Sequence, residues 1–349
     1  MIGCLKMLES VRRLPGHVAT GLAIAFTTFW TYWGAGEMYH EGWWGGWYNR
    51  LPYLVPIAVC LVPTLVALTW PIVGGALIVL VGVFAVIMFG RGVSILGILM
   101  ALVGGLFLID GMAKRRAVQE EAPSVPWWRR NLRYLLALGA PVVVFLTVSA
   151  VMLPVVLTRV DDGDRGARLI EGNGVALVWA PEGPGWNWKQ PWGGYPSWHS
   201  VALYGVPPVG LDDKPGYGRQ DGGYVYASGE NMAATNLCRY LSADGTRLMD
   251  EPQDVWRMPT TDEVVRSLVR HGESAGCAWN GEIRSQAACA VRPDKESPLW
   301  ATDRPVVYYW TADAYSEDRG IFVAYNGMVN ATVKSGGNPR HSYRCVRDP

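Results

Sequence analysis

Cysteine, histidine and carboxylate side chains are the groups in this chain that could do chemistry, and their spacing restricts what that chemistry is. The 349 residues include six cysteines and five histidines. No two cysteines form a Cys-x-x-Cys pair, so a structural zinc site is not indicated. The sequence also lacks the His-Glu-x-x-His motif and the phosphate-binding P-loop. We therefore predict no metal, no cofactor and no catalytic residue, and we interpret His199, His271 and His341 as surface or hydrogen-bonded histidines that do not take part in catalysis.

The segment from Glu37 to Tyr48 does place metal-ligating groups close together in sequence. His40 is flanked by Glu37 and Glu41, among several tryptophans and tyrosines. A metal ion on the polar groups, or a quinone or sugar stacked on the rings, is one interpretation. The other is an aromatic belt, in which tryptophan and tyrosine lie among lipid headgroups. A single histidine makes a poor metal site, so we favour the belt.

The chain has two halves of different composition. Half of all residues are hydrophobic and only 17% are charged. Residues 1–157 contain long apolar runs and hold 11 Lys and Arg against 6 Asp and Glu, a net charge of +5. Residues 158–349 have the composition of a globular domain rich in Gly, Pro and aromatic residues, with a net charge of −4. Neither half has a basic stripe interleaved with aromatics, which argues against nucleic-acid binding.

The first half is predicted to be a membrane domain, residues 15–157, behind a basic cytoplasmic lead, residues 1–14. Its apolar runs are each about long enough to cross a bilayer, for which roughly 17–25 residues suffice. The turns near Pro71 and Arg91 are very short, so spans two to four should form antiparallel hairpins. The five predicted spans are residues 17–34, 53–70, 72–89, 93–109 and 135–157.

Basic residues determine the predicted orientation. The lead and the segment 113–134 are both positive, and positive segments stay in the cytoplasm. Five spans then place the C-terminal half outside, which predicts a bacterial inner (plasma) membrane protein with a cytoplasmic N-terminus and the lipid bilayer as a partner. No charged residue lies within a span away from its ends. Ion and proton paths normally need such residues, so the spans are interpreted as an anchor or an assembly surface.

The second half is predicted to be a polar linker, residues 158–169, and an α+β domain, residues 170–349. Its four cysteines, at positions 238, 277, 289 and 345, suggest two disulfides in an exported domain, and three pairings are possible. An Asn-Gly pair at 326–327 predicts a hairpin. Helices are expected over 231–241 and from 261 to about 270, and strands over 175–179, 200–204, 306–310, 321–325, 329–333 and 343–347.

The most informative local pattern is the stretch from Trp256 to Val264. A capping box is predicted, with Thr260 as the N-cap and Glu263 three residues later. The proline at position 259 keeps the preceding residue out of helical backbone. We therefore expect Trp256 to be buried, Thr260 and Glu263 to cap a helix, and Arg257 to form a structural ion pair.

Three motifs together resemble the DUF1566 (Lcl C-terminal) family, which belongs to the formylglycine-generating-enzyme version of the C-type lectin fold. They are Trp256-Arg257-Met258-Pro259-Thr260, the run from Tyr309 to Tyr315, and Tyr343-Arg344-Cys345-Val346-Arg347. The resemblance covers about residues 170–349. It implies a C-type-lectin-like fold outside the membrane. Residues 1–157 resemble no family that we recognise.

The resemblance also implies a disulfide pattern. Lectin-like domains commonly tie their first helix to their last strand, which here pairs Cys238 with Cys345 and leaves Cys277 with Cys289. The enzyme branch of the fold uses a closely placed cysteine pair near its C-terminus, and this chain does not match that pattern. The related sulfoxide synthases take a histidine cluster from a partner domain, which the first half does not supply.

What remains is a candidate recognition surface in the loops and strand edges between Trp310 and His341. Tyrosine and asparagine provide rigid contact area and adaptable hydrogen bonds. The alternative is that the aromatic residues fill a small, loop-rich core. The predicted ligand-binding residues are Trp310, Asp313, Tyr315, Tyr325, Asn326, Asn330, Asn338 and His341.

We therefore expect a membrane-anchored recognition protein that binds a protein, peptide or glycan outside the membrane, without catalysis. Three alternatives stay open. They are a variable display protein of a diversity-generating retroelement, an oxidoreductase of the formylglycine-generating type, and a structural subunit of an envelope membrane complex.

Overall fold

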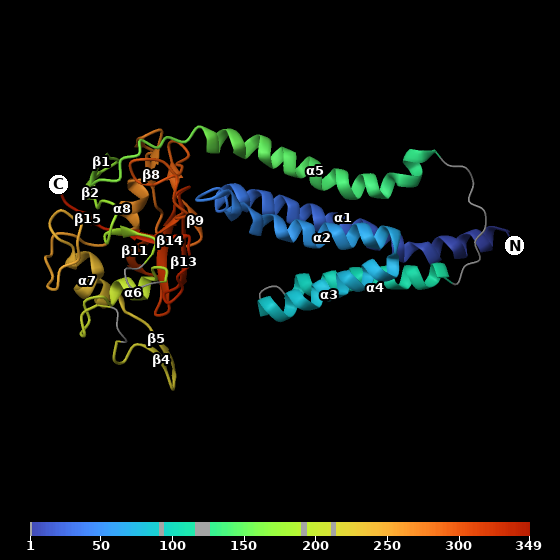
Figure 1. Cartoon of the computed structure of the whole chain (residues 1–349), viewed down its shortest axis with the longest axis horizontal. Coiled ribbons are helices and arrows are strands. Elements are labelled where there is room, and N and C mark those ends of the chain that lie inside the picture. Colours follow the sequence, from blue (N-terminus) through green and yellow to red (C-terminus); the bar gives the residue numbers. More distant parts are fainter. Residues whose placement is uncertain (1, 91–93, 116–125, 190–193, 211–213) are drawn as a thin grey trace. The chain divides into compact units, whose positions relative to one another are not determined.

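A computed structural model describes residues 2–90, 94–115, 126–189, 194–210 and 214–349 of the chain (Figure 1). The chain divides into two structural units, residues 1–157 and 158–349. This division coincides with the change in composition and net charge. The first unit is helical in its described residues, and the second is rich in β-sheet.

Unit 1, residues 1–157, consists of long helices built from the apolar runs. Four of its segments are long and apolar enough to cross a membrane: Trp47–Thr69, Pro71–Met88, Ser94–Arg115 and Asn131–Leu157. They correspond to predicted spans two to five. The first predicted span, residues 17–34, is helical but is not among those four, since threonines and aromatic residues dilute its apolar character. The elements are α1 (Ile2–His40), η1 (Trp47–Arg50), α2 (Leu51–Thr69), α3 (Pro71–Phe89), α4 (Ser94–Arg115) and α5 (Trp127–Leu157).

Glycines let α3 and α4 pack backbone against backbone. A Cβ atom added to Gly104 would lie 2.5 Å from the carbonyl oxygen of Gly75, and one added to Gly82 would lie 2.5 Å from that of Gly97. The glycines of each helix stand seven residues apart, so both fall on one face. Small residues at such an interface replace the hydrophobic driving force that lipid does not provide. Gly75 lies against Gly104 and Gly82 against Gly97, so the two helices run antiparallel, as predicted for this hairpin.

Unit 2, residues 158–349, is built around a six-stranded mixed sheet. β11 and β14 are parallel, and the other described pairs in this sheet are antiparallel. Trp310, Val323 and Val329 are fully buried on it. The strand order is β3 (Trp186–Asn187), β14 (His341–Arg344), β11 (Tyr308–Ala314), β12 (Arg319–Ala324), β13 (Met328–Val333), β9 (Ser285–Gln286).

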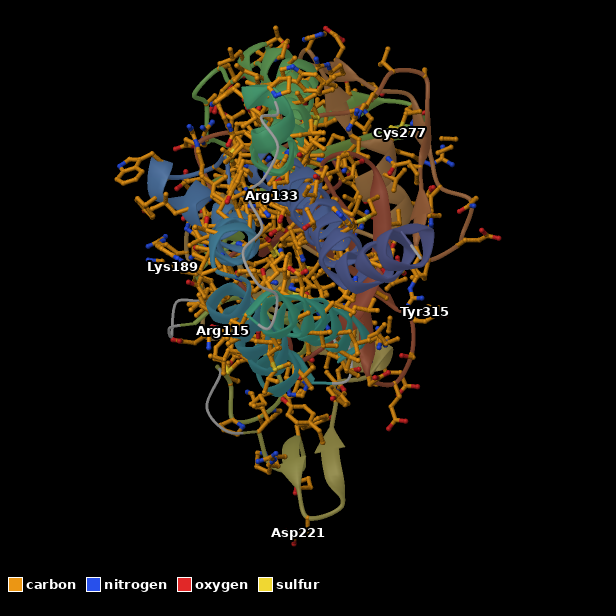
Figure 2. All side chains as sticks on the ribbon, turned by 90° about the vertical axis from the view of Figure 1, so that its right-hand side faces the viewer. Arg115, Arg133, Lys189, Asp221, Cys277 and Tyr315 are labelled. Atoms are coloured by element: carbon orange, nitrogen blue, oxygen red, sulfur yellow. A yellow bond between two sulfur atoms is a disulfide. The ribbon has the colours of Figure 1, made fainter. Side chains whose placement is uncertain are left out.

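Smaller elements surround this sheet, and the hairpin of β4 (Gly218–Gln220) and β5 (Gly223–Val225) projects from the unit with Asp221 at its tip (Figures 1 and 2). A three-stranded sheet comprises β1 (Arg168–Gly172), β2 (Val175–Trp179) and β15 (Val346–Arg347). The helices are α6 (Trp198–Ala202), α7 (Gly229–Thr235), η3 (Leu237–Tyr240) and α8 (Thr261–Arg266). The remaining pairs are β4 (Gly218–Gln220) with β5 (Gly223–Val225), β6 (Val269–Arg270) with β7 (Glu273–Ser274), and β8 (Cys277–Ala278) with β10 (Ala288–Cys289).

The stretch predicted to be a linker, residues 158–169, is instead fastened to the domain. Arg159 Nε lies 2.6 Å from Asp294 Oδ1, and both side chains are buried. Asp161 Oδ2 accepts hydrogen bonds from the N–H and the hydroxyl of Thr302, at 3.1 and 2.5 Å. Arg165 pairs with Asp161 at 2.8 Å. The charges that suggested a solvated linker therefore form a polar strap, and unit 2 begins immediately after α5 ends.

The capped joint predicted at Trp256–Val264 is confirmed. Thr260 is the N-cap of α8 and forms a capping box with Glu263. Arg257 pairs with Glu263 at 2.6 Å. Trp256 is 2% exposed and its indole N–H donates to the carbonyl oxygen of Ser242. Arg257 and Val346 exchange backbone hydrogen bonds at 2.8 and 2.9 Å, so the joint holds the last strand in place.

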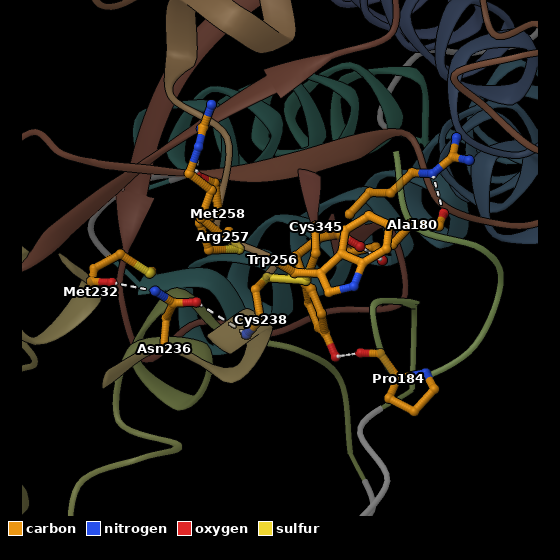
Figure 3. Close-up of a disulfide and its surroundings, with 12 residues drawn as sticks. Ala180, Pro184, Met232, Asn236, Cys238, Trp256, Arg257, Met258 and Cys345 are labelled. Carbon is orange, nitrogen blue, oxygen red and sulfur yellow. Dashed lines mark hydrogen bonds between the residues drawn. A yellow bond between two sulfur atoms is a disulfide. The ribbon is translucent and has the colours of Figure 1, made fainter. Parts of the chain in front are cut away.

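The two disulfides are those implied by the family resemblance. Cys238 bonds Cys345 across 107 residues, and Cys277 bonds Cys289 across 12. Figure 3 shows the long-range disulfide beside Trp256, with the Asn236 side chain hydrogen-bonded to residues 232 and 238. In the chain-entropy model, closing a loop of this length stabilises the folded state by roughly 4–5 kcal/mol.

Three secondary-structure predictions are wrong in detail. Residues 200–204 were expected to form a strand, but a capping box between Ser197 and Ser200 starts α6 instead. The helix predicted over 231–241 is interrupted at Asn236, whose ψ of 159° is extended. α8 ends at Arg266, short of 270, because the next residues turn at His271, with a φ of 54°, into the β6–β7 hairpin.

Candidate functional site

Three of the four predicted ligand-binding residues that carry a ring are in the core. Trp310, Tyr325 and His341 are 0%, 4% and 5% exposed. Trp310 stacks on His341 with 4.7 Å between ring centroids, and its indole N–H donates to the carbonyl oxygen of Pro196. Burial lowers the pKa of His341 to about 3, so the ring is neutral. The prediction that these three side chains contact a ligand is therefore wrong, because they pack the sheet.

The side chains of the predicted polar residues accept hydrogen bonds from backbone N–H groups. Asp313 Oδ2 accepts from the backbone N–H of Thr261 at 2.6 Å, which ties β11 to the start of α8. The side-chain oxygens of Asn326, Asn330 and Asn338 accept from the backbone N–H groups of residues 328, 331 and 340, respectively. These contacts shape turns and strands, which is the ordinary role of asparagine there.

Tyr315 is the one large predicted contact residue that lies open to solvent. Its side chain is 58% exposed, and it follows the end of β11 (Figure 2). Three of the eight predicted residues are buried and four accept hydrogen bonds from backbone N–H groups, so the set does not make one continuous surface.

A different cluster of aromatic side chains lies at the base of the β4–β5 hairpin. The His199 ring, on α6, lies 5.5 Å from the ring of Tyr224 and 6.4 Å from that of Tyr226. Tyr217 approaches the same histidine at 6.3 Å. Tyr224 and Tyr226 are 4.5 Å apart, and Tyr224 is 40% exposed. We call these four residues the tyrosine–histidine cluster.

Hydrogen bonds fix the cluster on the domain. The backbone N–H of Ala227 donates to His199 Nδ1 at 3.0 Å, and Lys334 Nζ donates to the carbonyl oxygen of Ala227 at 2.7 Å. Ala227 directly follows Tyr226. Its backbone N–H and its carbonyl oxygen are thus both hydrogen-bonded to side chains from other elements. The hydroxyl of Tyr217 hydrogen-bonds the Asn231 side chain. The rings are therefore positioned before any ligand arrives.

The cluster presents a neutral donor. Because His199 Nδ1 accepts a hydrogen bond, the proton of the neutral ring is on Nε2. Burial, with a smaller contribution from the charge of Lys334, lowers the pKa of His199 to about 4. Burial also lowers the pKa of Lys334, whose ammonium lies 4.5 Å from the ring centroid of Trp198. Near neutral pH, the histidine is therefore an uncharged donor beside aromatic faces.

The sequence carries a weak signal for this cluster. Tyr224 and Tyr226 are two residues apart, which in a strand places both side chains on one face. They stand in a glycine-rich segment with no apolar alternation, so periodicity alone indicates only a loop. The contribution of His199 depends on α6, which the sequence led us to expect as a strand.

One hydrolase-like motif is present but lacks the structure that the chemistry needs. Residues 272–276 read Gly-Glu-Ser-Ala-Gly, which matches the nucleophile pattern Gly-x-Ser-x-Gly. A nucleophilic serine of this type sits between a strand and a helix. Ser274 lies instead in the short β6–β7 hairpin, where its Oγ accepts from the backbone N–H of Gly276. We assign the motif a structural role.

In the described residues of unit 1, the side chains of Glu37, His40 and Glu41 form a group that could hold a metal ion. Their ligand atoms lie within 4.8 Å of one another.

Comparison with protein-family models, with curated proteins and with solved structures finds no match to this chain.

Proposed function

We propose that this chain is a bacterial inner-membrane protein whose C-terminal domain, of the DUF1566 and C-type-lectin-like type, binds a ligand outside the membrane without catalysis. Four apolar helices support the membrane assignment. The two disulfides of unit 2 support export, because such bonds persist in oxidising compartments. With α1 as a fifth span, the positive lead and the positive segment 113–134 both lie in the cytoplasm.

The tyrosine–histidine cluster is the observation that carries the recognition role. Tyrosine gives large, rigid, amphipathic contact area and loses little conformational entropy on binding. Here the rings are further restrained by the contacts to Ala227 and Asn231. Exposed ring faces with one neutral N–H donor suit a ligand with apolar C–H faces and hydroxyl or carbonyl acceptors. A glycan, a peptide and a protein loop all have these groups.

The function is tested with the full-length chain in lipid nanodiscs, applied to arrays of bacterial envelope glycans and of peptides. We expect saturable binding to one ligand class and none to the empty nanodisc. Copper- or oxygen-dependent turnover of a cysteine peptide by the same sample would contradict the proposal, because it would place the domain with the formylglycine-generating oxidoreductases. Stoichiometric copurification with another membrane complex, without array binding, would identify a structural subunit instead.

A further inference from the structure

The end of α1 and the residue that follows it bring three metal-ligating side chains together, since the N–H of Glu41 still donates to the carbonyl oxygen of Glu37 as in a helix. Glu37, His40 and Glu41 follow the i, i+3, i+4 pattern, which brings side chains together on a helix surface. Their ligand atoms all lie within 4.8 Å of one another, and His40 Nδ1 is 3.6 Å from Glu37 Oε2. All three residues are half-buried. The cluster therefore combines proximity with access to solvent.

The backbone around this cluster is fixed by aromatic packing. The indole N–H of Trp44 donates to the carbonyl oxygen of His40 at 2.7 Å, and Trp44 is 3% exposed. Tyr39 stacks on Trp43 with 5.2 Å between centroids. Gly42 allows α2 to come close, since a Cβ atom there would lie 2.7 Å from the ring of Tyr53. The aromatic residues that suggested a membrane belt thus wrap the end of α1.

One ligand candidate is also oriented from outside the helix. The hydroxyl of Tyr53, on α2, donates to Glu41 Oε2 at 2.8 Å. Ligating carboxylates in metal sites are typically held by such an outer hydrogen bond, which fixes the direction of the remaining lone pairs. Tyr53 therefore plays the part of a positioning residue for Glu41.

The cluster holds two carboxylates that one cation can bridge. Two carboxylates at i and i+4 repel each other on a helix. The C-terminal end of a helix adds partial negative charge from its unsatisfied carbonyl groups. A divalent ion between Glu37 and Glu41 neutralises both carboxylates, and the imidazole of His40 completes a set of one nitrogen and two oxygen ligands.

We propose that Glu37, His40 and Glu41 form a binding site for one divalent first-row transition-metal ion, with Zn²⁺ as the representative. Zinc accepts histidine and carboxylate ligands, and three protein ligands leave an open position for water or for a donor group of another molecule. Calcium fits less well, because it takes six to eight oxygen ligands. The site revises the expectation of an aromatic belt without a metal, and it does not depend on the proposed function of unit 2.

The proposal is tested by Zn²⁺ titration of the full-length chain, without a histidine tag, in nanodiscs. Calorimetry and elemental analysis after dialysis should find one Zn²⁺ per chain. His40→Ala and the isosteric Glu41→Gln should remove this ion. Tyr53→Phe keeps all three ligands and should weaken binding about 10-fold or more. Cobalt in place of zinc should give visible absorption bands that the His40→Ala protein lacks.

The matched control is His271→Ala, which removes an exposed histidine from unit 2 and should leave Zn²⁺ binding unchanged. Thermal unfolding of each variant without metal shows whether the fold is intact. Zn²⁺ binding of equal stoichiometry and affinity in folded Glu41→Gln and His40→Ala would overturn the proposal. So would the absence of Zn²⁺ binding to the wild-type chain at micromolar concentrations.

Discussion

The interactions that stabilise unit 1 internally differ from those that stabilise unit 2. In unit 1, the helices follow from long apolar runs, and close packing depends on glycines such as Gly75 and Gly104 that remove side-chain bulk. In unit 2, individual contacts between distant residues decide the structure. The disulfide of Cys238 with Cys345, the indole of Trp256 and the polar strap at Asp161 are examples. Composition therefore determines the first unit, whereas specific pairings determine the second.

The largest effect is expected from removing Trp256, on which the specific packing of unit 2 depends. Trp256→Ala should destabilise the domain by roughly 3–5 kcal/mol, the usual cost of deleting a buried aromatic side chain. Thermal unfolding monitored by near-UV circular dichroism measures the loss. Trp279→Ala is the matched control, because Trp279 is only half-buried and its indole bonds a neighbouring turn. A Trp256→Ala chain that stays fully folded but loses ligand binding would make this stretch a binding site.

In unit 1, a single side chain placed between α3 and α4 should separate the two helices. Gly104→Leu forces a side chain against the backbone of Gly75, and overpacking of this kind costs about 1–3 kcal/mol. Gly105→Leu is the control, since a Cβ atom there meets nothing within 4 Å. Heat-induced loss of helicity in detergent measures both. Equal midpoints for the two variants would show that glycine contacts do not set the packing of the bundle.

A smaller and pH-dependent effect is expected at the polar strap. Burial alone would raise the pKa of Asp161, but hydrogen bonds from Arg165, Thr302 and Gly163 outweigh it and hold the pKa below the usual value. A carboxyl group with a lowered folded-state pKa stabilises the fold above its unfolded pKa of about 3.9, and the contribution is lost as the pH falls further. Asp161→Asn should therefore cost about 1–2 kcal/mol at pH 7 and progressively less below pH 4.

Urea denaturation at pH 7, 4 and 3 measures this difference. Asp221→Asn, at the exposed tip of the β4–β5 hairpin, serves as the control and should change stability little at any pH. If the deficit of Asp161→Asn is the same at all three values, the strap does not act through the ionised carboxylate.

The predictions from sequence were correct where neighbouring residues determine the structure. The cap at Thr260 and Glu263 lies within four residues, and the Asn326-Gly327 turn within two. The predictions were wrong where contacts between distant residues determine the structure. Nothing near Trp310 in the sequence shows that it stacks on His341, or that the Asp313 carboxylate binds the start of α8.

The tyrosine–histidine cluster shows the same limit of prediction from sequence. His199 comes from α6 and Tyr224 from the β4–β5 hairpin, and Ala227 joins them through a backbone N–H. The sequence identified tyrosines as suitable contact residues, which the proposed function keeps. Their positions required the tertiary contacts of a short helix whose capping serines were not recognised.

We expect unit 2 to recognise its ligand through the tyrosine–histidine cluster and not through the surface between Trp310 and His341. The most direct measurement compares ligand affinity of the wild-type chain with two variants in nanodiscs. Tyr224→Ala should weaken binding at least 10-fold, because truncating a central aromatic contact typically costs 2 kcal/mol or more. Tyr315→Ala, an equally large change at the exposed end of the earlier predicted surface, should bind as the wild type does. Loss of binding in Tyr315→Ala, with Tyr224→Ala unaffected, would contradict the account.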